Sequence, residues 1–184
     1  IRLVPNLTMP QMAELVADPE FPRELFPFPV WRRTYPAGAL VSNVLGYVGE
    51  ISEEELRASA EGDYFGGDLI GKVGIERSYE PELRGAAGEE ALEVDARGRK
   101  VRTLDTRSVM KGSDLKLTLD MGVQKRAVEL LTGQKGALVV MDVRTGAVLA
   151  LASSPTYDNN PLAWGVSGRE WRDMTQDPAR PMLD

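Results

Sequence analysis

Apolar residues recur every three or four positions in three stretches of the chain, and this spacing predicts amphipathic helices. The first stretch begins with a capping box at residues 8–11, places Met12, Leu15 and Val16 on one face, and stops before Pro19. It predicts a short helix with a single apolar face.

The second stretch is charged and carries a narrow apolar stripe. The stripe consists of Ile75, Tyr79 and Leu83. Pro81 interrupts it, and because a proline removes a backbone donor and crowds the preceding turn, we predict two short helices. Gly85 is expected to end the second helix as a left-handed cap. Glu80 and Arg84, one turn apart, are predicted to form an exposed ion pair.

The third stretch follows Asp120, a residue type that caps helix starts, and ends at Gly133. Its apolar face comprises Val123, Ala127, Leu130 and Leu131. Two further capping boxes, at residues 52–55 and 167–170, predict shorter helices. The first box contains three consecutive acids, but adjacent helical residues diverge around the axis, so a solvated helix start is favoured over a metal site.

Alternating and continuous apolar runs predict the strands. Residues 31–35 and 115–119 read as single strands, and residues 137–143 and 147–152 as two strands joined by an Arg-Thr-Gly turn. Together with the third helix, these runs predict an α+β chain.

A hairpin is predicted at residues 93–104, with Val94, Val101 and Leu104 available for one buried face. Its basic residues are Arg97, Arg99, Lys100 and Arg102. A basic hairpin beside an acidic body would suit an acidic partner, and an exposed edge strand also needs charge to resist aggregation. Both interpretations remain open.

Two connections between these elements are rich in proline. Dense alternation of Phe and Pro at residues 21–29 predicts an extended connection, in which Phe21, Phe26 and Phe28 either pack beneath their own loop or form a partner site. Residues 35–38, Tyr-Pro-Ala-Gly, predict a tight turn.

Composition narrows the chemistry. The 184 residues are 42% apolar, enough for a packed core, and carry a net charge of −6, which disfavours nucleic acid and anionic membrane surfaces as partners. The chain has no Cys and no His, so it holds no Cys nucleophile, no Ser-His-Asp triad and no soft-ligand zinc site. No cofactor or metal is predicted, and no run of about 18 apolar residues predicts a membrane segment.

Residues 71–85 resemble the signature Gly-Lys-x-Gly-x-Glu-x-x-Tyr-Glu-x-x-Leu-x-Gly of the class B penicillin-binding proteins, the cell-wall transpeptidases. Residues 35–38, 45–49, 93–99 and 154–160 are similar to other landmarks of that family, in the same order, with a spacing typical of its rod-shape elongation members. The signature residues are Tyr35, Pro36, Gly38, Gly46, Tyr47, Gly71, Lys72, Gly74, Glu76, Tyr79, Leu83 and Gly85.

The resemblance implies two regions. Residues 1–112 correspond to a two-lobed, non-catalytic pedestal of short helices and extended hairpins, whose N-terminal lobe covers about residues 1–45. Residues 113–184 correspond to the first strand, helix and β-hairpin of a transpeptidase domain, ending before its nucleophile. We expect a fragment that is also trimmed at its start, where family members carry a membrane anchor.

Catalytic motifs of the family are imitated without their geometry. Ser108 and Ser113 each begin a Ser-x-x-Lys pattern, but the first lies in a linker and the second enters a predicted strand, where residues three apart face opposite sides. The Arg-Thr-Gly sequence at residues 144–146 lies at a hairpin turn, and Ser-x-Asn is missing. We predict no catalytic residue.

Three functional hypotheses follow from the resemblance. In the first, the chain is a pedestal at the extracytoplasmic, periplasmic face of the bacterial inner membrane, positioning the catalytic domain and binding a SEDS-type glycan polymerase (RodA-like) and an elongation scaffold (MreC-like). In the second, it is part of a transpeptidase whose catalytic half lies beyond residue 184. In the third, it is a stand-alone extracytoplasmic binding module.

A cluster of glycines lies between the N-terminal lobe and the second helical stretch. Gly66, Gly67, Gly71 and Gly74 could supply backbone rotation at a hinge between two lobes, or could serve tight turns alone.

Overall fold

The computed structural model describes residues 7–22, 25, 32–60, 62–96, 100–179 and 182. The helices are α1 Met9–Ala17, η1 Gly38–Leu40, α2 Ser42–Leu45, α3 Glu53–Ala58, α4 Gly74–Ser78, α5 Glu80–Arg84, α6 Met121–Leu131, α7 Asn160–Trp164 and α8 Gly168–Thr175. The predictions for Phe26, Phe28, Trp31 and residues 97–99 lie outside the described residues.

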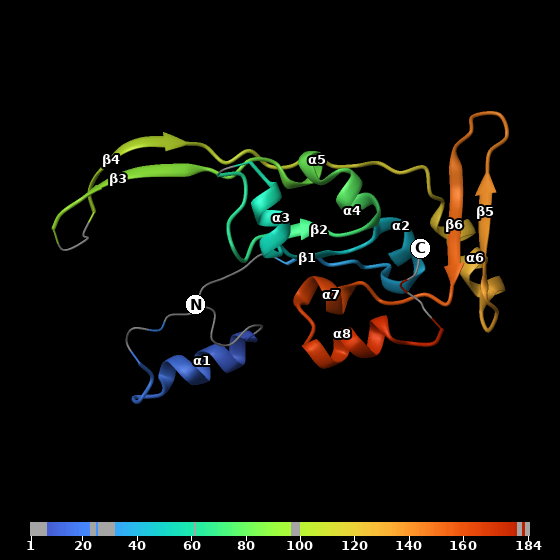
Figure 1. The fold of residues 1–184 in the computed structure, drawn as a ribbon, viewed down its shortest axis with the longest axis horizontal. Coiled ribbons are helices and arrows are strands. Elements are labelled where there is room, and N and C mark those ends of the chain that lie inside the picture. The colour runs from blue at the N-terminus through green and yellow to red at the C-terminus, as the bar shows by residue number, and fades with distance from the viewer. Residues whose placement is uncertain are drawn as a thin grey trace.

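The described strands form three separate antiparallel pairs. They are β1 Val48–Glu50 with β2 Leu69–Gly71, β3 Glu89–Val94 with β4 Lys100–Arg107, and β5 Gly136–Met141 with β6 Val148–Ser154. The molecule is elongated, with the β3–β4 hairpin projecting at one end and β5–β6 with α6 at the other (Figure 1). The mixed α+β fold is as predicted.

Helix starts follow the predicted capping chemistry. In α3, Ser52 Oγ accepts from Glu55 N at 3.2 Å while Glu55 Oε2 accepts from Ser52 N at 2.7 Å. In α8, Ser167 and Glu170 repeat this exchange at 3.2 and 2.7 Å. Both predicted helices are confirmed, because each box satisfies backbone donors that a helix start leaves unpaired.

The second helical stretch folds as two short helices, α4 and α5, as predicted, with Pro81 in the first turn of α5. Its apolar stripe is only partly buried, since Tyr79 is 44% exposed. The buried residue of α4 is instead Glu76. The predicted Glu80–Arg84 pair was also wrong: Arg84 Nη2 lies 3.7 Å from Asp68 Oδ2.

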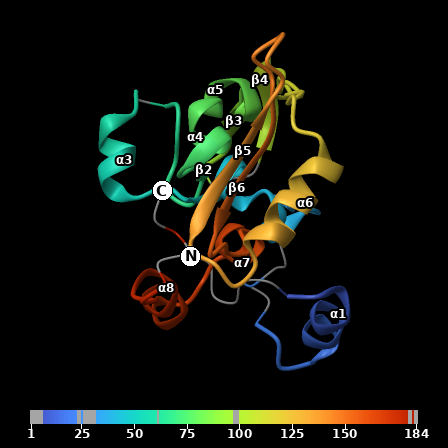
Figure 2. The same cartoon turned by 90° about the vertical axis from the view of Figure 1, so that its right-hand side faces the viewer.

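A small core joins α6 to the β5–β6 sheet. Helix α6 starts at the predicted cap, where Asp120 Oδ1 accepts from Gly122 N at 2.8 Å, and it lies along one face of the two strands (Figure 2). The core consists of Ala127, Ala150 and Ala152, with Val123, Val128, Leu131, Leu138 and Val140 packed against it. Leu130, predicted in this face, is 52% exposed, so that assignment was wrong.

Two predicted strands do not form. Residues 32–35 pair with no strand, and the backbone of Tyr35 bonds to a side chain instead. Residues 115–119 keep the predicted alternation of half-buried and exposed positions, but they approach β6 through isolated bonds such as Thr118 Oγ1 to Val148 O at 2.7 Å. Isolated bonds do not make a continuous ladder.

Two predicted apolar faces are exposed. The β3–β4 hairpin exists, but the three apolar residues assigned to its buried face are 54 to 60% exposed. They are Val94, Val101 and Leu104. In α1, Leu15 and Val16 are 38% and 54% exposed, and the helix has no buried residue.

Opposite charges face each other across the β3–β4 hairpin. Lys100 Nζ lies 2.8 Å from Glu90 Oε1, and Arg102 pairs with Glu93. The hydrogen bond from Lys100 lowers the pKa of Glu90. The basic charge at these two positions is therefore compensated within the hairpin.

Within the described part of the chain, no helix combines the length and the apolar character needed to cross a bilayer.

The chain crosses itself closely where α5 ends. Gly85 has φ 72° and ψ −152°, so the predicted left-handed helical cap was wrong. Glycine is required here because a Cβ would lie 2.2 Å from Met110 O. A Cβ on Gly112 would lie 1.9 Å from Leu83 O. The two glycines therefore let two backbone segments touch.

Gly112→Ala should lower the free energy of unfolding by more than about 2 kcal/mol, because the added methyl meets backbone atoms that cannot rotate away. Gly136→Ala is the matched control, since a Cβ there meets nothing within 4 Å. Urea unfolding of both variants measures the difference. Equal effects would mean that the crossing is looser than described.

Candidate functional site

The most connected polar region joins residues 33–46 to residues 156–164, and we call it the junction. Its central residue is Asn160, at the start of α7. Asn160 Oδ1 accepts from Tyr35 N at 2.8 Å, and Asn160 Nδ2 donates to Tyr35 O at 3.0 Å. One amide side chain thus satisfies both backbone groups of Tyr35, as a neighbouring strand would.

Other side chains of residues 156–164 bind further backbone carbonyls of the same segment. Thr156 Oγ1 donates to Ala39 O at 2.8 Å, and Asn159 Nδ2 donates to Gly46 O at 2.8 Å. Trp164 Nε1 donates to Arg33 O at 3.2 Å. The partners are thus unequal in kind: residues 33–46 offer mainly backbone, and residues 156–164 offer side chains.

A small apolar cluster lies beside these bonds. Tyr35, Val48 and Ala163 are buried together, with Leu45 packed against them. The Tyr35 hydroxyl accepts from Val48 N at 3.0 Å. Tyr47, another signature residue, makes an edge-on contact with Tyr157, with ring centroids 6.5 Å apart. The junction therefore combines directional bonds with close packing.

Glu76 connects the signature helix to this region. Its side chain is only 5% exposed and its Oε1 lies 2.6 Å from Arg33 Nε. Burial alone would lower the pKa of Arg33, but the hydrogen bond and charge of Glu76 raise it overall. Burial also raises the pKa of Tyr35, and the nearby carboxylate adds to this. Arg33 stays charged and Tyr35 stays neutral at physiological pH.

Signature glycines allow close backbone contact. A Cβ on Gly46 would lie 2.0 Å from Val73 O, and one on Gly74 would lie 2.7 Å from Val44 O. A Cβ on Gly71 would lie 2.2 Å from Glu76 O. Gly46 and Gly74 bring the signature segment against α2, and Gly71 brings β2 against α4. All three sites leave little room for rotation.

Gly66 and Gly67 are different, because they lie in an open turn where an added Cβ meets nothing closer than 3.8 Å. A hinge between two lobes stays a prediction, and this turn is the part of the glycine cluster with space for it.

Lys72 and Glu80 support the strands next to α4. Lys72 Nζ lies 2.5 Å from Glu55 Oε2, and Glu80 Oε2 accepts from Gly71 N at 2.8 Å. Arg84 stacks on Tyr64, 3.6 Å from the ring centroid. The signature segment thus contacts α3, β2 and Tyr64 at the same time.

The structure brings some signature residues together and not others. Those at or next to the junction are Tyr35, Gly38, Gly46, Tyr47, Gly74 and Glu76. Pro36 lies in the predicted turn, where Gly38 N donates to Tyr35 O at 2.9 Å. Tyr79 is exposed and Leu83 is half-buried, and both lie away from the junction bonds.

Sequence reasoning missed the side chains that make the junction. Thr156, Asn159 and Asn160 belong to a family landmark but received no role. Their signal was weak but present, since consecutive asparagines next to an apolar strand are residues that bind backbone groups.

The two Ser-x-x-Lys patterns lie outside helices. Ser108 precedes an isolated bridge at Met110, and Ser113 lies in the segment before α6. The described residues also contain no group of three or more acids that could hold a metal ion.

Arg33→Ala should cost about 1–3 kcal/mol of unfolding free energy, because it leaves the Glu76 carboxylate buried without its partner. The range is reduced because Arg33 is 46% exposed. Arg57→Ala is the control: its pair with Glu53 is 77% and 90% exposed, so a few tenths of a kcal/mol are expected. Denaturant unfolding of both variants measures the two losses of unfolding free energy. Equal losses would contradict the view that Arg33→Ala leaves a buried carboxylate without its cation.

Glu55 should make the unfolding free energy depend on acid pH. The hydrogen bond from Lys72, with help from the Ser52 backbone, lowers the Glu55 pKa from 4.5 to about 2. A lowered pKa means that stabilisation is complete above pH 4.5 and is lost as pH falls toward 2. Since Glu55 is 38% exposed, Glu55→Gln should remove less than about 1 kcal/mol of this dependence. Glu54→Gln in the same helix is the control, and an unchanged slope in Glu55→Gln would contradict the pairing.

Residues 2–117 match the penicillin-binding protein dimerisation domain. Peptidoglycan D,D-transpeptidase MrdA of Haemophilus influenzae is 38% identical over 186 residues, which cover 99% of this chain and 29% of the relative. MrdA of Escherichia coli K12 is 41% identical over 157 residues, covering 83% and 25%. The chain therefore spans less than a third of the length of these relatives.

Solved structures of penicillin-binding protein 2 share the fold of this chain. The complex between penicillin-binding protein 2 and MreC from Helicobacter pylori aligns with a TM-score of 0.78 at 34% identity, over 95% of this chain and 31% of that one. Penicillin-binding protein 2 of Pseudomonas aeruginosa, solved with WCK 5153, aligns with a TM-score of 0.68 at 35% identity, over 83% and 30%. With a matched domain, similar sequences and a shared fold, the chain belongs to the class B penicillin-binding proteins and carries the dimerisation domain of the penicillin-binding protein 2 type.

Proposed function

We propose that this chain carries the non-catalytic pedestal of a peptidoglycan D,D-transpeptidase and that the pedestal sets the position of the catalytic domain during cell-wall synthesis. The observation that carries this proposal is the junction, where side chains of residues 156–164 hold backbone groups of residues 33–46. We assign residues 1–112 to the pedestal and residues 113–184 to the start of the transpeptidase domain. On this assignment, the junction joins the two regions.

The geometry of the junction suits a positioning role. Hydrogen bonds are directional, so several bonds to one segment fix orientation as well as distance. Ser42 and Asn159 are fully buried, and breaking a buried bond leaves a polar group without water. Rotation of one region against the other would break several such bonds together.

Partners of the elongation machinery form the second part of the proposal. The Helicobacter pylori relative was solved with MreC, and the fold it shares with this chain supports an MreC-like scaffold as partner. A RodA-like glycan polymerase rests on the family resemblance alone. We place the chain at the extracytoplasmic, periplasmic face of the inner membrane, as part of a membrane-anchored parent.

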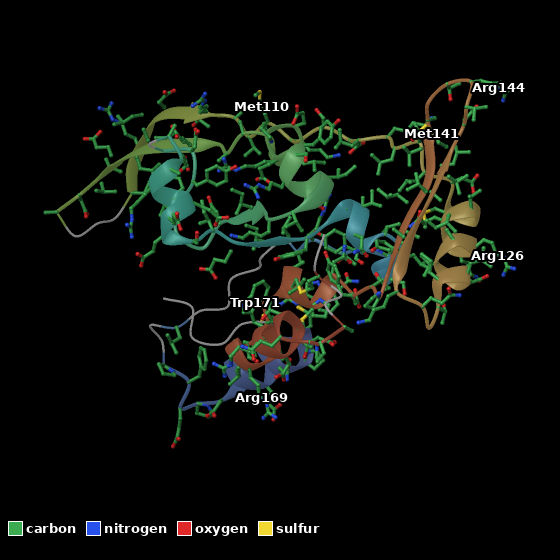
Figure 3. The ribbon with its side chains drawn as sticks, turned by 45° about the vertical axis from the view of Figure 1, so that its right-hand side comes forward. Met110, Arg126, Met141, Arg144, Arg169 and Trp171 are labelled. Carbon is green, nitrogen blue, oxygen red and sulfur yellow. The ribbon has the colours of Figure 1, made fainter. Side chains whose placement is uncertain are left out.

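A second candidate, catalysis by a longer protein, is favoured by one surface. The face of β5–β6 turned away from α6 exposes Val139, Met141 and Leu151 at 56%, 52% and 39%, and Figure 3 marks Met141 on this sheet. Apolar sheet faces are normally covered by another layer. A catalytic half beyond residue 184 could provide that layer.

Distance measurement by pulsed electron resonance tests the positioning role. Because the chain has no cysteine, spin labels on Arg77→Cys and Arg126→Cys report only on α4 and α6, and Arg126 points away from the body (Figure 3). We expect one narrow distance. Thr156→Val with Asn160→Leu should broaden it, because both changes remove junction bonds.

The matched control is Thr132→Val with Gln134→Leu, a comparable pair of hydroxyl and amide replacements at exposed positions outside the junction, which should leave the distance narrow. A broad distance in the unmodified chain would contradict the positioning role. Calorimetric titration of this chain with purified MreC from the organism that encodes it tests whether an MreC-like scaffold binds. Serum albumin is the control. A narrow distance without MreC binding would mean that the chain only positions the catalytic domain. MreC binding with a broad distance would favour a stand-alone binding module.

A further inference from the structure

Gln124 of α6 is buried at 1% exposure and makes three hydrogen bonds to backbone groups. Its Oε1 accepts from Leu151 N at 2.9 Å, and its Nε2 donates to Leu151 O at 2.9 Å. The same Nε2 donates to Leu40 O at 2.7 Å. One amide therefore contacts α6's own neighbour β6 and the short helix η1 at once.

The two bonds to Leu151 continue an edge of the sheet. Along that edge of β6, Asp120 N donates to Leu149 O at 2.9 Å. The next N–H and C=O on the edge belong to Leu151, and both bond to the Gln124 amide. Gln124 thus replaces one residue of a missing strand, in the way that Asn160 does for Tyr35.

The bond to Leu40 gives this arrangement a second consequence. An amide is a planar, rigid group, so its nitrogen and oxygen cannot move independently. If Leu40 moves relative to Leu151, at least one of the three bonds must lengthen. Thr156 also reaches residues 39–43, but from the loop after β6, whereas Gln124 reaches the strand itself.

We infer that Gln124 is a positioning residue that couples η1 to β6, so that a displacement of residues 38–40 reaches the sheet at Leu151 through this amide. The inference rests on the proposed function only in naming the two sides pedestal and transpeptidase domain. Coupling of this kind is reciprocal, so a change at β6 must also be felt at η1.

Amide hydrogen exchange, read residue by residue by NMR on the whole chain, tests the coupling. Gly38→Ala strains η1 because Gly38 has φ +47°, and it should speed exchange of Val41 N–H, which bonds to Gly38 O at 3.2 Å. We expect Leu151 N–H to speed up with it, about fivefold or more. In a Gln124→Met background, Leu151 should already exchange fast, and Gly38→Ala should add nothing.

The reverse direction uses Gln124→Met alone, which should speed exchange of Val41 as well as Leu151. Gln134→Met is the matched control, since Gln134 is an exposed amide just beyond the same helix. Leu56 N–H, bonded to Ser52 O at 2.9 Å in α3, serves as the reference and should not change.

If Leu56 speeds up equally in Gly38→Ala, that variant opens as a whole, and Thr156→Val replaces it by removing the bond to Ala39 O without backbone strain. The inference is overturned if Val41 responds to these changes while Leu151 does not, or if Gln124→Met leaves Val41 unchanged. No partner is present in this experiment, so its failure leaves MreC binding and the labelled distance untouched.

Discussion

Every backbone amide that leaves water needs a hydrogen-bond partner, and the described structure is organised by how residues 33–46 meet this requirement. Among the described residues, no strand pairs with this segment. Side-chain amides and hydroxyls from distant parts of the chain take the strand's place, with Asn160 on Tyr35 and Gln124 on Leu40. These side chains add directional bonds to the small apolar cluster and to the close backbone contacts at Gly85 and Gly112.

Glycine supports this arrangement by removing side chains where the backbone must approach closely. Gly46 and Gly74 bring the signature segment against α2, and Gly71 brings β2 against α4. Gly85 and Gly112 bring the end of α5 against the segment that leads to α6. At each site a methyl group would collide with main-chain atoms. The short helices are thus held at backbone distance, which explains why such small sheets and helices need no large core.

Local structure was largely predictable from sequence because its causes are local. Capping boxes located the starts of α3 and α8, Asp120 located α6, and Pro81 separated α4 from α5. The β5–β6 hairpin followed from two apolar runs around a short turn. In each case the contacts that form the element lie within a few residues of one another, so the local sequence is enough to predict the element.

Burial and the junction were less predictable, because both depend on residues far apart in the chain. Periodicity placed Tyr79 on an apolar stripe, whereas the buried residue of α4 is Glu76, held by Arg33, 43 positions away. The capping rule that predicted a left-handed helical cap at Gly85 failed because the reason for glycine there is a backbone contact with Met110, 25 positions away. Asn160 lies 125 positions from Tyr35, and a local sequence pattern cannot predict a hydrogen bond between residues so far apart.

The unequal chemistry of the junction has an evolutionary consequence. Because residues 33–46 take part mainly through main-chain atoms, most substitutions there leave the contacted groups in place, whereas Thr156, Asn159 and Asn160 each contribute a particular side chain. Positions that contribute only a main-chain atom, such as Leu40, can therefore vary more than these three side chains, whereas Tyr35 and Gly46 stay constrained by burial and by close backbone contact. The side chains around such main-chain contacts could change over time while the junction keeps its hydrogen bonds.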